Sequence, residues 1–264
     1  MTDKTAKDSS SKVAGANPTK ISKKEEGLAL LKDIVSIIVF YFVFTTFAWG
    51  AFHIPSGSME PTLEVGDRIF VSKLAYGYNR YSLPLDPKSV GEGRIFSDTA
   101  DRGDVAVFTL PHRDSIDFIK RVIGLPGDTL QMTNGRLYIN GSLVKRTFIR
   151  DVNYTDYNGI DRRAKEYEEE LPGGVKHRIY ERTDNGPVDN TNLYVVPVGH
   201  YFMMGDNRDG SADSRYLDNM GYVKHEHLVG RADITTFSLY DCDQGKEVTC
   251  PLGIPFGRFF NSLN

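Results

Sequence analysis

The chain is organised around residues 54–63, which read Ile-Pro-Ser-Gly-Ser-Met-Glu-Pro-Thr-Leu. This segment begins within a few residues of the end of the long apolar run of the sequence. Its Gly and Pro residues cannot continue a membrane helix. It therefore places two hydroxyls, those of Ser56 and Ser58, about one strand step apart at the edge of a bilayer. On local composition alone, such a segment is more typical of a turn that leads away from a membrane.

The apolar run that precedes this segment predicts a membrane anchor. Residues 34–52 contain no Asp, Glu, Lys, Arg or His, and a spanning helix needs roughly 20 apolar residues. Trp49 and Phe52 suit an aromatic belt at the far interface. A cleaved signal peptide is the alternative, but its apolar region is typically only about 7–15 residues long. Residues 1–33, a tail and helix start that we expect to be disordered up to residue 24, carry seven Lys against five acidic residues. This excess predicts a cytoplasmic N-terminus, with everything after Phe52 outside.

The composition excludes some classes of partner. The net charge of −3 gives no nucleic-acid footprint. The six His are scattered, and the two cysteines, Cys242 and Cys250, lack the spacing of a zinc site, so we expect no metal and no cofactor. In an oxidising compartment the two cysteines would close a short disulfide loop; two separate thiols are the alternative.

The sequence after the anchor predicts a mostly β domain built from antiparallel strands. Asn134-Gly135, between two alternating runs, is a strong hairpin signal. Residues 145–190 are polar and charge-rich, and we expect irregular structure there with a short helix over 165–170. We predict a catalytic β core made of 53–129 and 198–264, with a smaller β-rich subdomain inserted over 130–197. The expected strands are 66–74, 104–110, 117–124, 130–133, 136–139, 193–197, 201–204 and 232–239.

A serine nucleophile needs a base, and a lysine is the candidate here. A free hydroxyl is hardly ionised at neutral pH, and no G-x-S-x-G elbow is present. Lys120 lies in an alternating run that places it on one strand face between Phe118 and Val122. An ammonium between apolar neighbours invites a lowered pKa, which would make it a usable base. The alternative is a lysine that protects an edge strand from aggregation.

A third stretch, residues 205–215, holds three acids, two Arg, two Ser and one Asn. The calcium-loop pattern of EF-hands fails because Arg208 and Leu217 occupy ligand positions. Opposite charges at close spacing favour a satisfied polar network that supports catalytic groups. A solvated loop is the alternative.

Together these stretches resemble bacterial type I signal peptidase (leader peptidase), a membrane-anchored Ser-Lys endopeptidase. Many members of that family have two N-terminal membrane segments, whereas this sequence contains one. The segments that carry the resemblance, in chain order, are 54–63, similar to the nucleophile box; 102–108, similar to a core strand; 118–128, similar to the general-base box; and 205–215, similar to the box that closes the site.

The resemblance implies a role for each matching residue. Ser58 would be the nucleophile and Lys120 the general base. The Ser58 backbone N–H and the Ser56 hydroxyl would form the oxyanion hole. The residues that would orient Lys120 and brace its loop are Ser211, Asp213 and Arg215. The positions that match the substrate-binding pockets are Phe52, Ile54, Pro55, Met59, Leu63, Phe118 and Ile119.

By the same resemblance, the substrate would be a preprotein cleaved after a small-x-small pattern at the end of its signal peptide. The expected location is the bacterial plasma membrane, with one membrane pass and the catalytic domain on the outer, periplasmic face. We expect a monomer that contacts the lipid bilayer, including through residues 251–260. The alternatives are another Ser-Lys protease, such as a self-cleaving repressor, and a membrane-anchored β binding module. The binding module predicts that Ser58 and Lys120 lie far apart.

Overall fold

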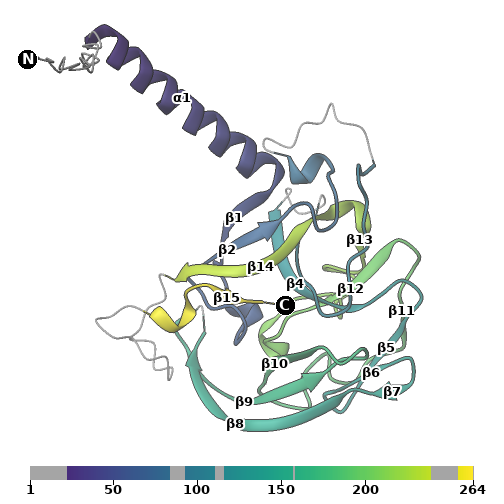
Figure 1. The fold of residues 1–264 in the computed structure, drawn as a ribbon. Coiled ribbons are helices and arrows are strands. Elements are labelled where there is room, and N and C mark those ends of the chain that lie inside the picture. The colour runs from purple at the N-terminus through teal and green to yellow at the C-terminus, as the bar shows by residue number, and fades with distance from the viewer. Residues whose placement is uncertain (1–22, 84–92, 111–115, 157, 239–254, 264) are drawn as a thin grey trace, which may run out of the picture. The chain divides into compact units, whose positions relative to one another are not determined.

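The structure is a computed structural model that describes residues 23–83, 93–110, 116–156, 158–238 and 255–263. The chain divides into two compact units, Met1–Phe42 and Val43–Asn264, which are described separately. An N-terminal helix is followed by antiparallel β-sheets (Figure 1). The predicted fold class, mostly β with one apolar N-terminal helix, is therefore confirmed.

The N-terminal helix α1 (Lys23–Phe47) ends earlier than the sequence predicts. Among the described residues, one helical stretch, Glu26–Phe47, is long and apolar enough to cross a membrane. The predicted boundary at Phe52 is wrong, because the residues after the helix form strand β1 (Trp49–His53). Their backbone groups pair with a strand that follows in the sequence, from Trp49 opposite Ser72 to His53 opposite Arg68. Trp49 and Phe52 are thus sheet residues.

The largest sheet carries the segments that the sequence analysis singled out. In the described part of the chain it has eight strands, all paired antiparallel. Their order is β1, β2 (Asp67–Ser72), β14 (Leu228–Ser238), β3 (Val105–Leu110), β4 (Ile116–Gly124), β12 (His200–Met204) and β13 (Val223–Lys224), with β15 (Asn261–Ser262) paired to β14.

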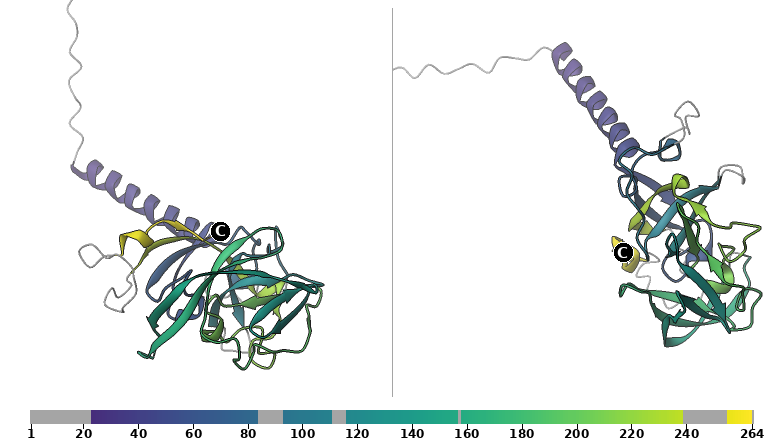
Figure 2. Two further views of the ribbon diagram at one scale, coloured as in Figure 1. Left: turned by 90° about the horizontal axis from the view of Figure 1, so that it is seen from below. Right: turned by 90° about the vertical axis from the view of Figure 1, so that its right-hand side faces the viewer.

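Two smaller sheets lie between β4 and β12 in the sequence. One has the order β11 (Tyr194–Val195), β5 (Thr129–Thr133), β6 (Arg136–Ile139) and β7 (Ser142–Leu143). Its β5–β6 hairpin turns at Asn134 and Gly135, both with positive φ, as predicted. The other has the order β10 (Lys176–Glu181), β9 (Asp161–Glu170) and β8 (Lys145–Thr155). Figure 2 shows from two further sides that β8 and β9 run together along their length.

The prediction of irregular structure with a short helix over 165–170 is wrong. Residues 161–170 form β9, the central strand of the three-stranded sheet. Opposite charges face each other across its pairs, as at Lys145 with Glu170 and Arg146 with Glu169. Such cross-strand pairs offset the low strand propensity of charged residues. The prediction failed because it took a polar, charge-rich composition as a sign of irregular structure.

A hydrophobic cluster holds the segment 54–63, which contains one of the short 3₁₀ turns of the described chain. The 3₁₀ turns are η1 (Gly57–Met59), η2 (Arg80–Ser82), η3 (Arg208–Gly210), η4 (His225–His227) and η6 (Phe256–Arg258). Ile54, Met59 and Leu63 are buried together with side chains of β2, β3 and β14, among them Val71 and Val105. The segment is therefore fixed on the main sheet by its apolar residues, which leaves the polar residues between them at the surface of that cluster.

Part of the prediction near the C-terminus falls outside the described residues. Cys242 and Cys250, with their predicted disulfide, lie there, as do residues 251–254. Of the segment expected to touch the membrane, Phe256 and Phe260 are described, and 49% and 77% of their surface is exposed. Contact with lipid stays a prediction.

Candidate active site

The predicted nucleophile lies in a short turn whose backbone is hydrogen-bonded to neighbouring segments. Ser58 is the central residue of η1, and the preceding Ser56 is extended and makes no side-chain cap hydrogen bond to the turn. Ile54 anchors the approach, because its N–H donates to Asp67 O at 2.9 Å and its carbonyl accepts from Gly66 N at 2.9 Å. The turn therefore presents two hydroxyls from a fixed backbone.

Lys120 reaches this turn from β4. Its Nζ lies 2.6 Å from Ser58 Oγ and 3.1 Å from the carbonyl oxygen of Ile119. Only 4% of the residue is exposed. Burial lowers the pKa of Lys120 to about 8, against the raising effect of the Asp213 and Asp206 carboxylates. The structure thus brings Ser58 and Lys120 together, contrary to what the binding-module alternative predicts.

The loop after β12 lies against the same pair through Asp213. This carboxylate accepts two hydrogen bonds from Arg215, at 2.8 and 2.9 Å, and one from Gly205 N at 3.0 Å. Burial alone would raise the pKa of Asp213, but the Arg215 guanidinium holds it below its ordinary value. Both residues are buried, so the pair braces the loop as the resemblance implies.

Ser211 departs from its predicted contact. The resemblance implies a hydrogen bond from Ser211 to Lys120, but the buried Ser211 hydroxyl interacts with the Asp213 carboxylate instead and helps to lower its pKa. A Cβ on Gly205 would lie 2.3 Å from Ser211 Oγ and 2.4 Å from Ser58 O. Ser211 therefore packs close to the nucleophile turn across a glycine, but its predicted hydrogen bond is not formed in this structure.

Sequence reasoning missed two further groups that hold the site. Arg121, next to Lys120, donates to Asp206 through Nε at 2.9 Å and through Nη2 at 2.6 Å, and both side chains are buried. Asn207 donates from its backbone N to Ser58 O at 3.2 Å and from Nδ2 to Gly57 O at 3.0 Å. The alternation along the strand predicts that Arg121 faces away from Lys120. Asp206 and Asn207 both lie in the polar stretch 205–215. Nothing in the sequence indicates that Asp206 pairs with Arg121 or that Asn207 binds the nucleophile turn.

The residues matched to substrate pockets divide into two groups. Ile54, Met59 and Leu63 are almost fully buried, with 3%, 0% and 0% of their surface exposed. These three side chains can therefore support the floor of a pocket, but they have almost no surface that a substrate can contact. Phe52, Phe118 and Ile119 are half-buried, and Pro55 is exposed. This second group keeps surface that a bound chain can contact.

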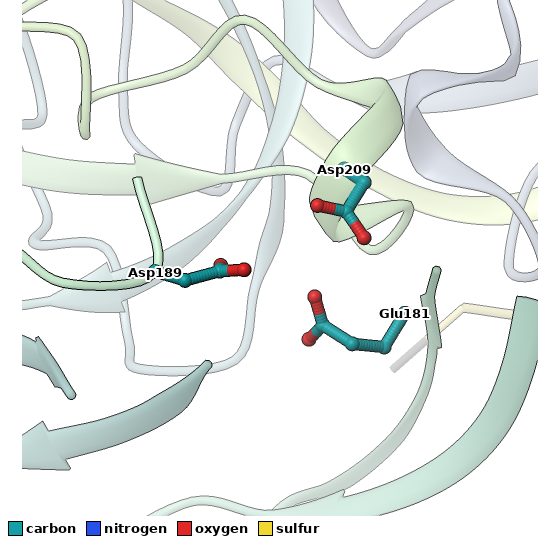
Figure 3. A group of neighbouring side chains, drawn as sticks. All are labelled: Glu181, Asp189 and Asp209. Atoms are coloured by element: carbon teal, nitrogen blue, oxygen red, sulfur yellow. The ribbon is translucent and has the colours of Figure 1, made fainter. Parts of the chain in front are cut away.

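Three acidic side chains meet near the loop that carries Asp213. Glu181 ends β10, Asp189 precedes β11 and Asp209 lies in η3; Figure 3 shows their carboxylates pointing toward one another. One oxygen from each lies within 4.8 Å of the others. The sequence predicts no metal, and these residues did not enter that prediction. Glu181 and Asp189 each have a buried oxygen without a hydrogen-bond partner, and burial raises the pKa of Glu181 to about 9.

Replacing Glu181 by Gln is expected to stabilise the protein at alkaline pH. The folded-state pKa near 9 exceeds the ordinary value of 4.5. Between these values the folded state binds a proton that the unfolded state has released, so stability falls as pH rises. Glutamine cannot ionise; it gives up the 3.3 Å ion pair of Glu181 with Arg146, but Arg146 keeps an ion pair at 3.0 Å with Asp184. We expect a gain on the order of 1–3 kcal/mol at pH 8 and little change near pH 5, measured by urea unfolding.

Glu168→Gln is the matched control, because this glutamate is 42% exposed in its side chain and we expect a change within about 0.5 kcal/mol. A Glu181→Gln protein that loses stability at pH 8 would show that the ionised carboxylate is favourable in the folded state. The ion pair of Glu181 with Arg146, at 3.3 Å, would then outweigh the cost of burying the charge.

Comparisons with known proteins identify the family of the chain. The family model described as signal peptidase, peptidase S26, matches residues 28–237. A signal peptidase I of Pseudomonas aeruginosa is 40% identical over 210 residues, covering 76% of this chain and 69% of that protein. A signal peptidase I of Rickettsia massiliae is 35% identical over 230 residues, covering 84% and 82%. The crystal structure of a signal peptidase I from Enterococcus faecalis is 27% identical, covers 51% of this chain and 97% of that one, and has a TM-score of 0.30.

A half-buried serine within hydrogen-bond distance of a buried lysine, both held by an antiparallel β-sheet, is an arrangement suited to peptide hydrolysis. The match over most of the chain shows that it belongs to the signal peptidase family, peptidase S26, and it is therefore a peptidase. Its apolar N-terminal helix is suited to membrane anchoring.

Proposed function

We propose that the protein is a membrane-anchored serine endopeptidase that removes N-terminal signal peptides from exported preproteins. Ser58 is the nucleophile and Lys120 the general base. The observation that carries the proposal is the 2.6 Å separation of Ser58 Oγ and Lys120 Nζ in a site where the lysine is buried. The lowered pKa of Lys120, about 8, gives a working fraction of neutral amine near neutral pH.

The acylation step follows from this contact. Neutral Lys120 accepts the Ser58 proton as Oγ attacks the carbonyl carbon of the scissile bond. The Ser58 N–H and the Ser56 hydroxyl donate to the oxyanion that develops, an effect worth about 3–4 kcal/mol for one donor in a known protease. Collapse breaks the C–N bond, and the Lys120 ammonium returns the proton to the leaving amine. The acylated serine then carries the signal peptide.

Deacylation uses the same groups. Neutral Lys120 removes a proton from water, whose oxygen attacks the ester carbonyl of acylated Ser58. The C–O bond to Ser58 breaks, and the proton passes from Lys120 to the serine oxygen. Both half-reactions require Lys120 to be neutral at the start. The buried ion pairs of Arg121 with Asp206 and Arg215 with Asp213 hold the surrounding loops through both steps.

An unpaired strand edge supports binding of the signal peptide as an added strand. β12 pairs with β4 at Arg121, Val122 and Gly124. Among the described strands, none pairs with residues 116–120 on that edge. An extended peptide can hydrogen-bond there and beside residues 52–56, which alternates its side chains into and out of the site. Apolar surface from Phe52, Phe118 and Ile119 leaves room for small side chains, which supports cleavage after a small-x-small pattern.

The short sequence distance between the anchor and the nucleophile supports a site near a membrane surface. Helix α1 ends at Phe47, and the nucleophile follows eleven residues later. The seven Lys of residues 1–33 favour a cytoplasmic N-terminus, and hence a catalytic domain on the outer face of the bacterial plasma membrane. The cleavage site of an exported preprotein emerges on that side.

Cleavage of a purified preprotein tests the proposal. The full chain in detergent should release a signal peptide and leave a new N-terminus directly after a small-x-small pattern, as read by mass spectrometry. Replacing the small residue before the cut by Leu should slow cleavage by about 10²-fold, because the buried side chains beneath the pocket cannot move aside. A preparation carrying Ser58→Ala provides the blank for contaminating peptidases. Equal cleavage of the Ala and Leu substrates would contradict the proposed specificity.

Gly205→Ala should reduce activity about 10²-fold. The added methyl would lie 2.3 Å from Ser211 Oγ and 2.4 Å from the backbone oxygen of Ser58, so the nucleophile turn must shift. A displacement of about 1 Å at a reacting group costs a rate factor of this size. The measurement is kcat/KM on the preprotein, with circular dichroism to confirm the fold. Gly257→Ala is the control, since a Cβ there meets no atom within 4 Å, and the idea fails if both variants keep full activity.

A further inference from the structure

A polar cavity lies next to the nucleophile turn, outside the groups that the proposed mechanism uses for the signal peptide. Its volume is about 360 Å³. Gly57 lines it from the nucleophile turn, and Ser211 and Ala212 line it from the loop after β12. Tyr154 of β8, Asn158 of the connecting turn and Arg162 of β9 form part of its wall. None of the seven residues matched to the signal-peptide pockets lines it.

We infer that this cavity binds the first residues of the mature protein, on the leaving-group side of the scissile bond. The inference rests on the proposed function. A substrate whose signal-peptide half occupies the edge of β4 must continue past Ser58 beyond the cut. Gly57 immediately precedes Ser58, so the cavity begins where that continuation starts. The ligand is therefore an extended peptide segment carrying, after cleavage, a new α-amino group.

The lining chemistry selects a polar segment. No lining residue has a large aliphatic side chain; the wall is made of amides, phenols, hydroxyl, guanidinium and carboxylate groups. These side chains donate to and accept from a peptide backbone and polar side chains, and no Leu, Ile, Val, Met or Phe side chain is present to receive a second hydrophobic segment. The signal-peptide side is lined by Phe52, Phe118 and Ile119 instead. The two sides of the cut thus differ in polarity.

The Arg162 guanidinium is the group in the cavity wall through which binding of the mature segment can be tested. Its Nε pairs with Asp156 Oδ2 at 2.8 Å, and 36% of its side chain is exposed, so part of the guanidinium faces the cavity. The next residue, Arg163, is exposed and does not line the cavity. Alternation along β9 turns the two side chains to opposite faces. They form a matched pair with the same chemistry and different positions.

The β8–β9 hairpin thereby acquires a role in the proposed reaction. Asn207 links the two parts, because its Nδ2 lies 3.0 Å from Gly57 O and 3.3 Å from the Tyr154 hydroxyl. The wall of the cavity is therefore held at a fixed position relative to the nucleophile turn. A binding site built this way lowers KM rather than supplying a reacting group.

The test compares two peptide substrates with the same signal-peptide half. One ends with a single mature residue, and the other continues with four polar residues. The wild-type chain should cleave the longer peptide with a KM about three- to tenfold lower, the range of one hydrogen bond gained. In Arg162→Met most of this gain should be lost, whereas kcat/KM for the shorter peptide stays unchanged. Arg163→Met should behave like the wild type.

Other outcomes have a definite meaning. If Arg162→Met and the wild type gain equally from the extension, or if four Leu residues give the same gain as four polar ones, the inference is overturned. If the wild type cleaves neither peptide while folded, the proposed function itself fails. A polar tetrapeptide with a free α-amino group provides a second readout: it should inhibit the wild type competitively and inhibit Arg162→Met less. Equal inhibition of both would also count against the cavity.

Discussion

Replacing Lys120 by Met is expected to lower preprotein cleavage by about 10⁴-fold without weakening the fold. The methionine side chain has a similar length but no group that can accept the Ser58 proton. General-base catalysis contributes about 10²–10⁴-fold by itself, and nucleophile and base act as one unit. The loss should therefore match that of Ser58→Ala. Because the buried ammonium is replaced by an apolar group, urea unfolding should show equal or greater stability.

Lys73 supplies the control for this substitution. It is also buried, with 8% of its surface exposed, and its Nζ donates to the carbonyl oxygens of Thr45 and Thr46 at 3.2 and 3.4 Å. Lys73→Met should leave kcat close to the wild-type value. Cleavage by Lys120→Met within tenfold of the wild type in single-turnover assays would refute the role of Lys120 as the base.

Replacing Asp206 by Asn is expected to destabilise the fold and to shift the pH dependence of the rate. The change leaves the buried Arg121 guanidinium without its carboxylate, and breaking a buried pair from one side costs about 3–5 kcal/mol. Asp206 also raises the pKa of Lys120, so its removal lowers that pKa further below 8. The base works when neutral. The wild-type rate should therefore rise with pH through about 8, and the variant should reach its plateau at lower pH.

The double variant Arg121→Met with Asp206→Asn separates the two effects. It removes both charges, so much of the lost stability should return, as found when buried pairs are replaced by apolar groups. Unfolding free energy and pH–rate profiles of kcat/KM are measured for the wild type, Asp206→Asn and the double variant. A midpoint that moves upward in Asp206→Asn, or stability equal to that of the wild type, would contradict the assigned roles of this pair.

Local signals in the sequence were sufficient for the fold class and for the strand that carries Lys120, whereas the pairing of Lys120 with Ser58 was predicted from the family resemblance. Asn134-Gly135 favours a tight hairpin turn in which both residues have positive φ, and the structure contains this turn. The alternation around Lys120 gave its strand and its face. These features depend on neighbours in the sequence, so composition and spacing contain them.

Non-local pairing explains the errors. Nothing in the apolar run 34–52 marks Phe47 as its end, because β1 exists only by pairing with β2, from Trp49 opposite Ser72. The charged segments became β8 and β9 for a similar reason, since each charge finds its partner on another strand. A single sequence shows the charges but not which of them face each other.

The same limit applies to the site. Ser58 and Lys120 were identified through motifs, but Arg121 and Asp206 are separated by 85 positions and meet only after β4 pairs with β12. The departure of Ser211 from Lys120 is a matter of side-chain geometry that no motif encodes. Asn207 holds the turn through its backbone and amide, which a sequence pattern does not distinguish from an exposed loop residue.

The unpaired edge of β4 has a cost as well as a use. An exposed strand edge is a template for any extended chain, and proteins usually blunt such edges to avoid aggregation. In the binding mode that we propose, a substrate strand pairs at this position, so the edge stays uncovered. Asp117 lies on this open stretch and is exposed, and a charge there discourages a second β4 from docking on the first. The charge of Asp117 therefore opposes self-association of the domain at the edge of β4, where we propose that the substrate peptide binds.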